Sequence, residues 1–377
     1  LMDAIFARCR LKRLEKLQRV INATGVLIHT NFGRSPLGRN LLCNLPDELS
    51  GYVNLEYHIP TRKRGKRGGF AEELICRLTG AGDALIVNNN AAAVFLLLNE
   101  FAAGREVVVS RGELVQIGGG FRVPEIMARS GARLVEVGTT NITTLDDYRA
   151  AMSGDTAMVL SVHRSNFFMG GFTDAPSLRE LSSLKGESVL VARDLGSGNL
   201  LRGPALPQPF EPDIAQELAE GADLVCFSGD KLLGSCQAGF IVGRADLIAR
   251  LRKNQLMRIL RVDKVTYYLT QEALLNYSRG EAESLPVWNL ILQKKEDITR
   301  RLKNCLRRVD SRWRPRLLNI PTAGTYGGGA MPGVEIASSG LAFDLDGVPA
   351  EIIHDHFITS LPPVAGVIEN GRFVLDF

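Results

Sequence analysis

The chain has 377 residues and a formal net charge of +4. Hydrophobic residues make up 45% of it and charged residues 23%, which is typical of a globular protein and not of a disordered one. No apolar stretch approaches the ~20 residues that a membrane-spanning helix needs, so we expect no membrane partner. The six cysteines are scattered without a Cys-x-x-Cys pair, which disfavours a zinc site or a disulfide framework and favours a cytoplasmic location.

The chain opens with a basic, helix-like segment over residues 1–18. Further along, between about residues 80 and 245, short apolar runs alternate with helix-length amphipathic stretches. Such alternation predicts an α/β fold built from βαβ units, with a mostly parallel sheet covered by helices on both faces. The strand-like runs are 84–88, 106–110, 133–137, 157–162, 188–194, 223–228 and 239–243.

After Arg258 the pattern becomes more helical, over 265–276 and 287–308, and short strand-like runs close the chain. The glycine-rich stretch 322–330 is predicted to be a loop. We therefore predict three parts: a helical segment over 1–18, a large domain over 19–263 that carries the candidate site, and a small α+β domain over 264–377.

Polar residues follow the strand-like runs, and the most informative of them is Lys231, in Ser228-Gly-Asp-Lys231. A lysine at a strand end beside glycines loses hydration, which lowers its pKa and makes its amine nucleophilic. Amines of this kind form Schiff bases with pyridoxal 5′-phosphate (PLP). The motif alone also fits a surface lysine, so the prediction depends on its companions.

Two further strand ends supply those companions. Asp194 ends an apolar run, and a carboxylate there would pair with the pyridinium nitrogen of PLP. Asn166 follows the preceding run, and its amide would donate to the ring oxygen of the cofactor. Taken alone, these two residues also fit a helix cap and a turn. The order and separation of Asn166, Asp194 and Lys231 resemble those of fold-type I PLP enzymes, the aspartate-aminotransferase-like group.

A phosphate site completes the predicted set. Asn89, Asn90 and Ala91 join a strand-like run to an apolar helix, whose exposed N–H groups and dipole favour an anion. Ser228 would add a hydroxyl to the same phosphate. The sequence has neither a GxGxxG motif opening a helix after a strand nor a P-loop motif. The His-Asp-His stretch at 354–356 has no further clustered ligands, and we expect no metal site.

Several longer strings go beyond this cofactor motif. They include Val20-Ile-Asn-Ala-Thr-Gly-Val-Leu-Ile-His-Thr-Asn-Phe-Gly-Arg34-Ser-Pro-Leu, Val87-Asn-Asn-Asn-Ala-Ala-Ala-Val, Val162-His-Arg-Ser-Asn-Phe, Asp194-Leu-Gly-Ser-Gly, Ser228-Gly-Asp-Lys-Leu-Leu-Gly and Leu260-Arg-Val-Asp-Lys. Together they resemble one family, bacterial selenocysteine synthase, also called L-seryl-tRNA(Sec) selenium transferase. The resemblance extends from about residue 19 to the C-terminus.

The resemblance implies that selenium replaces the hydroxyl of a tRNA-bound serine. PLP would be the cofactor, seryl-tRNA(Sec) the acceptor substrate and selenophosphate the selenium donor. Lys231 would be the catalytic base, with Asp230 assisting proton transfer or orienting it. Arg34, Arg258 and Arg261 match the family's anion-binding positions, although salt bridges across a subunit interface also fit them. The resemblance further implies a homo-oligomer, a dimer or a ring of dimers, with the active site formed between subunits.

The sequence departs from the family pattern at three places. Family members carry an N-terminal tRNA-binding domain longer than the segment that precedes Val20 here, so tRNA selection stays open. Ser235-Cys236 replaces Gly-Pro close to the lysine, and Val367 stands where an arginine is expected. These departures keep open a PLP lyase that acts on a free or phosphorylated amino acid. Another alternative is an inactive homologue that only binds tRNA or only contributes subunits to an oligomer. The presence of Asn166, Asp194 and Lys231 together disfavours it.

Overall fold

The computed structural model describes residues 2–117, 120–186, 188–204, 206–207 and 210–377. The chain forms two compact units, each built from separate segments. The large unit consists of Gly33–Leu292 and Gly327–Gly333, and the small unit of Leu1–Phe32, Gln293–Tyr326 and Val334–Phe377.

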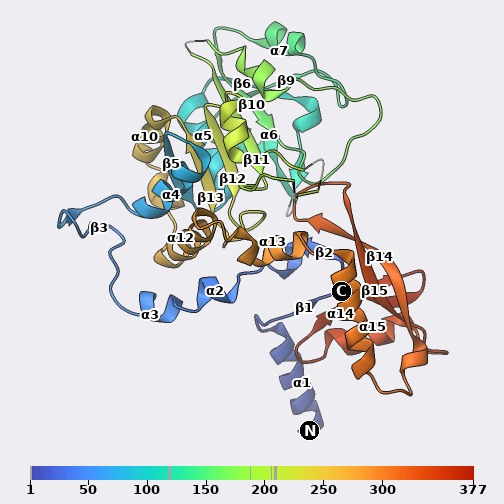
Figure 1. The fold of residues 1–377 in the computed structure, drawn as a ribbon. Coiled ribbons are helices and arrows are strands. Elements are labelled where there is room, and N and C mark those ends of the chain that lie inside the picture. Colours follow the sequence, from blue (N-terminus) through green and yellow to red (C-terminus); the bar gives the residue numbers. More distant parts are fainter. Residues whose placement is uncertain (1, 118–119, 187, 205, 208–209) are drawn as a thin grey trace. The chain divides into compact units, whose positions relative to one another are not determined.

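A seven-stranded sheet forms the core of the large unit (Figure 1). Its strands are β5 (Asp83–Val87), β6 (Glu106–Ser110), β9 (Arg133–Val137), β10 (Thr156–Val162), β11 (Leu190–Gly196), β12 (Leu224–Ser228) and β13 (Gly239–Gly243). They lie in the order β5-β13-β12-β11-β10-β6-β9, and only β13 pairs with its neighbours in antiparallel fashion. The predicted α/β fold with a mostly parallel sheet is confirmed.

Helices cover both faces of this sheet. One face packs against α5 (Asn90–Ala102), α6 (Val123–Ser130) and α10 (Ala245–Lys253), which share a single cluster of buried side chains with the strands. On the other side, α4 (Gly69–Thr79) packs against β5 and α9 (Ile214–Ala219) against β12. Every residue of β10, β12 and β13 is therefore buried, which explains why these strands read as continuous apolar runs.

The rest of the large unit surrounds this core. A hairpin of β3 and β4 precedes α4, and α12 packs against α4. The remaining elements are α2 (Arg39–Leu42), α3 (Leu45–Leu49), β3 (Tyr57–His58), β4 (Lys63–Arg64), β7 (Gln116–Ile117), β8 (Phe121–Arg122), α7 (Leu145–Ala151), α8 (Leu178–Ser182), α11 (Met257–Leu260), α12 (Lys264–Ser278), α13 (Pro286–Ile291) and the 3-10 turns Arg111–Glu113 and Ala282–Ser284.

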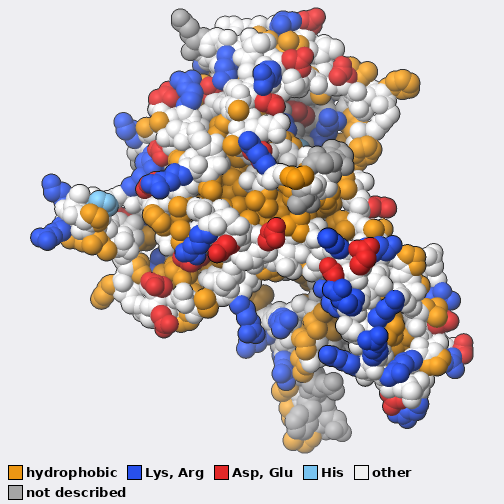
Figure 2. Space-filling view, viewed as in Figure 1, with side chains coloured by type: hydrophobic (Ala, Val, Ile, Leu, Met, Phe, Trp, Pro, Cys, Tyr) orange, Lys and Arg blue, Asp and Glu red, His pale blue; other side chains and the backbone are white. Residues whose placement is uncertain are grey.

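The small unit contains a second, five-stranded sheet in the order β17-β18-β15-β14-β2. Its elements are α1 (Met2–Glu15), β1 (Ile21–Asn22), β2 (Val26–Ile28), α14 (Lys295–Arg308), β14 (Leu317–Gly327), β15 (Glu335–Phe343), α15 (Ala350–Ile358), β16 (Val364–Ala365), β17 (Val367–Glu369), β18 (Arg372–Asp376) and the 3-10 turns Thr30–Phe32 and Arg314–Arg316. Lys and Arg side chains gather on the surface of this unit (Figure 2). Across the described parts of both units, no helix is long and apolar enough to cross a bilayer.

The glycine-rich stretch 322–330, predicted as a loop, is strand through Gly327. It pairs with β15 as far as Thr325, whose N–H also donates to the Gly25 carbonyl at 2.8 Å. A Cβ on Gly324 would lie 2.7 Å from the oxygen of Gly25. Glycine here therefore permits two backbones to approach closely and does not mark a turn, which is why the composition misled the prediction.

The compact units divide the chain differently from the predicted domains. The segment before residue 33 belongs with the C-terminal part because Ile21 pairs with Val364 in the β1–β16 ladder. The segment 264–292 belongs with the large unit, since the hydroxyl of Tyr277 is bonded to the carbonyls of Leu232 and Leu233 at 3.0 Å each. A boundary at residue 264 would cut through these contacts.

Tyr277 offers a test of this packing. Its buried hydroxyl also accepts a hydrogen bond of 2.6 Å from Trp288 Nε1. Tyr277→Phe leaves the indole N–H and the carbonyls without this partner, so we expect unfolding free energy to fall by about 1–3 kcal/mol in urea denaturation. Tyr52→Phe, at a fully exposed tyrosine, should change it by less than about 0.5 kcal/mol. Equal stability of the two variants would contradict the assigned role.

Candidate active site

Lys231 lies on a tight loop between β12 and β13. Gly229 closes this loop, because its N–H donates to the Ala238 carbonyl and its carbonyl accepts from Ser235 N, both at 2.9 Å. A Cβ on Gly229 would lie 2.7 Å from the oxygen of Cys236, so only glycine fits. Ser235 does not adopt a positive φ, and a serine in place of the family's glycine therefore costs no backbone strain at this position. The loop holds Lys231 in a defined place at the sheet edge.

Two glycines border the amine of Lys231. A Cβ on Gly329 would lie 2.9 Å from Lys231 Nζ, and one on Gly196 would lie 3.8 Å from it. Their bare backbones leave space beside the amine that any other residue would fill. Burial lowers the pKa of Lys231, and the carboxylates of Asp194 and Asp230 oppose that shift only in part. The site therefore favours a neutral, nucleophilic amine.

Asp194, on β11, lies at the same edge of the sheet. Its Oδ1 accepts a hydrogen bond of 2.8 Å from Asn90 Nδ2, at the start of α5. Burial raises the pKa of Asp194, while the bond from Asn90 and the nearby charge of Lys231 act in the opposite direction. A carboxylate placed in this way can hold a protonated nitrogen of a ligand.

The N-terminus of α5 also opens onto this edge. Asn89 is its N-cap, and the Asn89 side chain accepts from Ala92 N at 2.9 Å. The N–H groups of Asn90 and Ala91, in the first turn, have no acceptor within the helix, so they can bind an anion. Ser228 ends the neighbouring strand β12 and is buried.

Arg258 and Arg261 follow on α11 and its C-cap. The Leu260 carbonyl accepts from Asn88 N at 3.0 Å, and Arg261 forms an isolated bridge with Val87. These contacts bring the backbone of the predicted pair to the end of β5, where α5 begins. Within the described residues, neither arginine side chain forms an ion pair, so both guanidinium groups can bind an anion.

Arg34 forms an ion pair with Asp230, and a backbone hydrogen bond joins the two segments. Its Nη1 lies 2.6 Å from Asp230 Oδ2, and the N–H of Ser35 donates to the Asp230 carbonyl at 3.0 Å. Arg34 has φ 64°, which costs a non-glycine residue energy and persists only where the surroundings enforce it. The guanidinium is 36% exposed, so donors remain for a ligand. This strained contact joins two predicted site residues, Arg34 and Asp230.

Asn166 lies in the segment after β10, one residue beyond Ser165, whose side chain borders Gly329. Asn166 is exposed, and its Nδ2 donates to the Gln116 carbonyl at 2.6 Å. His163 directly follows β10, and its backbone N–H donates to the Asp194 carbonyl at 2.8 Å. Burial, together with the charges of Arg193 and Lys231, lowers the pKa of His163 to about 3. The His163 imidazole is therefore neutral near pH 7, and its pKa responds to the charge of Lys231.

Sequence reasoning missed His163 and Glu211. Glu211 is buried, lies 3.9 Å from His163 Nε2, and accepts from Met331 N at 2.6 Å. That bond fixes the Gly327–Gly333 segment, which carries Gly329 to Lys231. The position of His163 directly after a strand was a usable signal. Glu211 had none, because it lies in a loop far from the other motifs in sequence.

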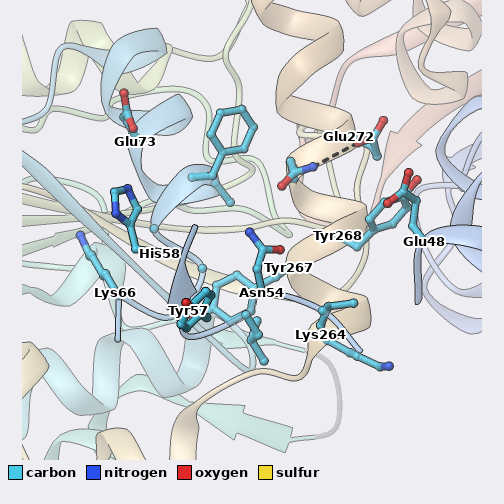
Figure 3. Close-up of a pocket in the computed structure, with 18 of the residues that line it drawn as sticks. Glu48, Asn54, Tyr57, His58, Lys66, Glu73, Lys264, Tyr267, Tyr268 and Glu272 are labelled. Atoms are coloured by element: carbon cyan, nitrogen blue, oxygen red, sulfur yellow. Dashed lines mark hydrogen bonds between the residues drawn. The ribbon is translucent and has the colours of Figure 1, made fainter. Parts of the chain in front are cut away.

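A separate hollow of about 780 Å³ lies elsewhere in the large unit (Figure 3). It opens between α12, which carries Tyr267, Tyr268 and Glu272, and the segment that carries Asn54 and Tyr57. None of the predicted site residues lines it. We therefore do not take it for the catalytic cavity.

Comparison with solved structures defines the class of protein. A structure of D-glucosaminate-6-phosphate ammonia-lyase is 21% identical, with a TM-score of 0.66, and the match covers 97% of this chain and 92% of that one. An aspartate aminotransferase mutant of Thermus thermophilus is 16% identical, with a TM-score of 0.50 and coverage of 99% and 91%. The fold is that of fold-type I PLP enzymes, as predicted.

Sequence comparison then identifies the family. The family model described as SelA, L-seryl-tRNA selenium transferase, matches residues 20–377. The L-seryl-tRNA(Sec) selenium transferase of Desulfotalea psychrophila is 43% identical, and the match covers 98% of this chain and 81% of the relative. That of Campylobacter concisus is 46% identical, over 96% and 79%. The chain belongs to the L-seryl-tRNA selenium transferase family, which confirms the resemblance found in the sequence.

The electrostatics of the site predict how Asp194 influences Lys231. The Asp194 carboxylate raises the pKa of Lys231, so Asp194→Asn should lower that pKa further. The test is the rate at which an amine-modifying reagent labels Lys231 in the cofactor-free protein, measured by peptide mass spectrometry over a range of pH. The midpoint of this pH dependence should move to lower pH in the variant. Asp246→Asn, at an exposed carboxylate paired with Arg244, should leave the midpoint unchanged. A midpoint that stays in place or rises in Asp194→Asn contradicts this coupling.

Proposed function

We propose that this protein converts seryl-tRNA(Sec) to selenocysteinyl-tRNA(Sec), with PLP as cofactor and selenophosphate as selenium donor. The observation that carries the proposal is the amine of Lys231, desolvated beside Asp194 and Asp230 in a chain of this family. The scattered thiols favour the cytoplasm as the place of reaction.

The residues around Lys231 fit PLP. Lys231 would bind it covalently, Asp194 would pair with its ring nitrogen, and the N–H groups at the start of α5, with Ser228, would hold its phosphate. Buried side-chain atoms at this edge lack partners among the described residues, namely Asn90 Oδ1, Asp230 Oδ1 and His163 Nδ1. Buried polar atoms rarely stay unpaired, so they support a polar ligand here. Asn166, predicted to bind the cofactor, is exposed and bonded to the Gln116 carbonyl, and its role remains a prediction.

The chain's own residues can perform the proton transfers. When bound, PLP withdraws electrons from the α-carbon of the seryl group. Lys231, whose lowered pKa favours the neutral amine, takes the α-proton and returns a proton to the departing β-hydroxyl. Asp230 is held by Arg34 and precedes Lys231 in the chain. Its Oδ1 has no hydrogen-bond partner among the described residues, so it can orient the amine. The hydroxyl leaves as water, and selenium from selenophosphate then bonds to the β-carbon. The selenium–phosphorus bond breaks by addition of water, inorganic phosphate leaves, and a proton returns to the α-carbon.

The selenium donor needs cationic partners, and Arg34 is the best placed. Its guanidinium is fixed by Asp230, which leaves further N–H groups for the oxygens of selenophosphate. Arg258 and Arg261 would add charge at the end of β5, where their backbone runs. Because Asp230 pairs with Arg34 and precedes Lys231 in the chain, the donor would bind close to the base.

A homo-oligomer, a dimer or a ring of dimers, is part of the proposal. Two exposed aromatic side chains, Tyr57 and Phe70, line the hollow of Figure 3. Exposed apolar groups beside a hollow are a common feature of protein interfaces. A second copy of the chain would cover them.

The function is tested by turnover. Purified protein, seryl-tRNA(Sec) and selenophosphate should yield selenocysteinyl-tRNA(Sec), and Lys231→Ala should reduce the rate by at least about 1,000-fold because it removes both the attachment point and the base. Lys253→Ala, at an exposed lysine ending α10, should retain the wild-type rate. Release of pyruvate from free serine or phosphoserine, without product on tRNA, would instead identify an amino-acid lyase.

Arg34 provides a separate test of donor binding. Arg34→Gln removes charge-assisted hydrogen bonds, so kcat/KM for selenophosphate should fall about 10- to 150-fold. PLP should still attach covalently to Lys231 in this variant, as measured by its absorbance. Arg39→Gln, at an exposed arginine of the same segment, is the control and should behave as wild type. A loss of PLP attachment without a change in selenophosphate dependence would assign Arg34 to the cofactor instead.

A further inference from the structure

The small unit presents a strongly basic helix face. In α14, Ile298 and Leu302 are buried against the five-stranded sheet, and Thr299 Oγ1 bonds to Ser339 Oγ at 2.8 Å. These contacts fix which side of the helix faces the core. Arg300, Lys303 and Arg307 therefore share one stripe on the opposite, exposed side, because they are spaced i, i+3 and i+7.

Few acidic side chains pair with the cations of this stripe. Arg300 pairs with Asp297, but Arg307 only contacts the Asn304 amide oxygen, and Lys303 has no ion pair within the described residues. Other exposed arginines, among them Arg77, Arg122 and Arg149 of the large unit, each pair with an acidic residue three or four positions away and so carry compensated charge.

Like charges at these spacings destabilise a helix, by about 0.2–0.5 kcal/mol for each pair. Lys303 and Arg307 stand four residues apart, and Arg300 and Lys303 stand three apart. Helix formation does not require three cations at these positions, because Gln and Glu have helix propensities similar to those of Lys and Arg. The stripe therefore indicates a negatively charged ligand.

An exposed tryptophan continues this surface. Trp313 is 54% exposed, and its N–H donates to the Asp310 carbonyl at 3.0 Å. Arg314 anchors the same turn to the end of α14, donating to the carbonyls of Val309 at 2.8 Å and Arg307 at 2.7 Å. The guanidinium also offsets the partial negative charge of the helix C-terminus. These backbone bonds fix the turn that carries Trp313, and its exposed indole is suited to stack on a nucleic-acid base.

We propose that Arg300, Lys303, Arg307 and Trp313, together called the α14 surface, bind RNA. The stripe would contact backbone phosphates, and Trp313 would stack on an unpaired base of the same molecule. The inference rests on the proposed function, in which the RNA is the seryl-tRNA brought to the site. A shallow hollow of about 720 Å³ runs along the stripe, and the basic surface of this unit is visible in Figure 2.

The test compares two charge-matched triple variants by fluorescence anisotropy with labelled tRNA(Sec). R300Q/K303Q/R307Q should weaken binding at least tenfold near 0.1 M salt and reduce the slope of log K against log salt by about 2–3, since each lost phosphate contact removes about 0.7–0.9. The control, R77Q/R122Q/R149Q, removes three exposed but paired arginines and should match wild type. Thermal unfolding and PLP attachment to Lys231 verify that both proteins are folded.

Trp313→Ala gives an independent readout. Loss of one stacked base should weaken tRNA binding about 5- to 150-fold while the salt slope stays at the wild-type value. Trp313→Phe should restore most of the affinity.

Wild-type binding by the α14 triple variant, or an equal loss in the control triple, would overturn the inference. Binding of anionic lipid vesicles but not of tRNA would overturn it as well. Turnover measured on the same preparations separates the two proposals. If wild-type protein forms selenocysteinyl-tRNA and the α14 variant binds normally, only the inference fails. If wild-type protein binds tRNA through the α14 surface but forms no product, the proposed function fails.

Discussion

An amine that is withdrawn from water loses part of its proton affinity unless nearby negative charge compensates, and the site depends on how this balance is set at Lys231. Burial lowers the pKa of Lys231, and the carboxylates of Asp194 and Asp230 oppose the shift only in part. Glycines at 196 and 329 leave space beside the amine, and Gly229 lets the lysine loop close. The parallel sheet supplies the positions, because the carboxyl ends of β11 and β12 meet at one edge with the start of α5.

The same balance extends outwards through Asp230. Its ion pair with Arg34 ties the lysine loop to a segment nearly two hundred residues earlier, and Arg34 accepts a left-handed backbone conformation to make it. Strain of this kind is usually retained where function requires it. On the other side, neutral His163 and buried Glu211 connect the amine to the Gly327–Gly333 segment. The reactive group, its orienting carboxylate and the anion-binding guanidinium are therefore parts of one network.

Much of this could be predicted from the sequence, for physical reasons. Buried parallel strands are continuous apolar runs in the sequence. The strands of the sheet, and the edge that carries Asp194, Ser228 and Lys231, could therefore be predicted. Contacts that depend on tertiary geometry could not. Asn166 and His163 are three residues apart after the same strand, and nothing in the sequence indicates that Asn166 is exposed while His163 is partly buried. Gly324 was predicted to lie in a loop because glycine is typical of turns. Here glycine is needed instead for the close approach of two backbones, at Gly25. The division into units also escaped prediction, since the β1–β16 pairing joins opposite ends of the chain.

The central claim is that Lys231 is the attachment point of the cofactor. The most direct measurement is borohydride reduction of the PLP-loaded protein, followed by proteolysis and peptide mass spectrometry. The account predicts that the added pyridoxyl phosphate mass lies on the peptide containing Lys231, and that the mass is absent from Lys231→Ala treated in the same way. A stoichiometric label on another lysine, or an unlabelled protein whose PLP is bound without a covalent bond, would contradict it.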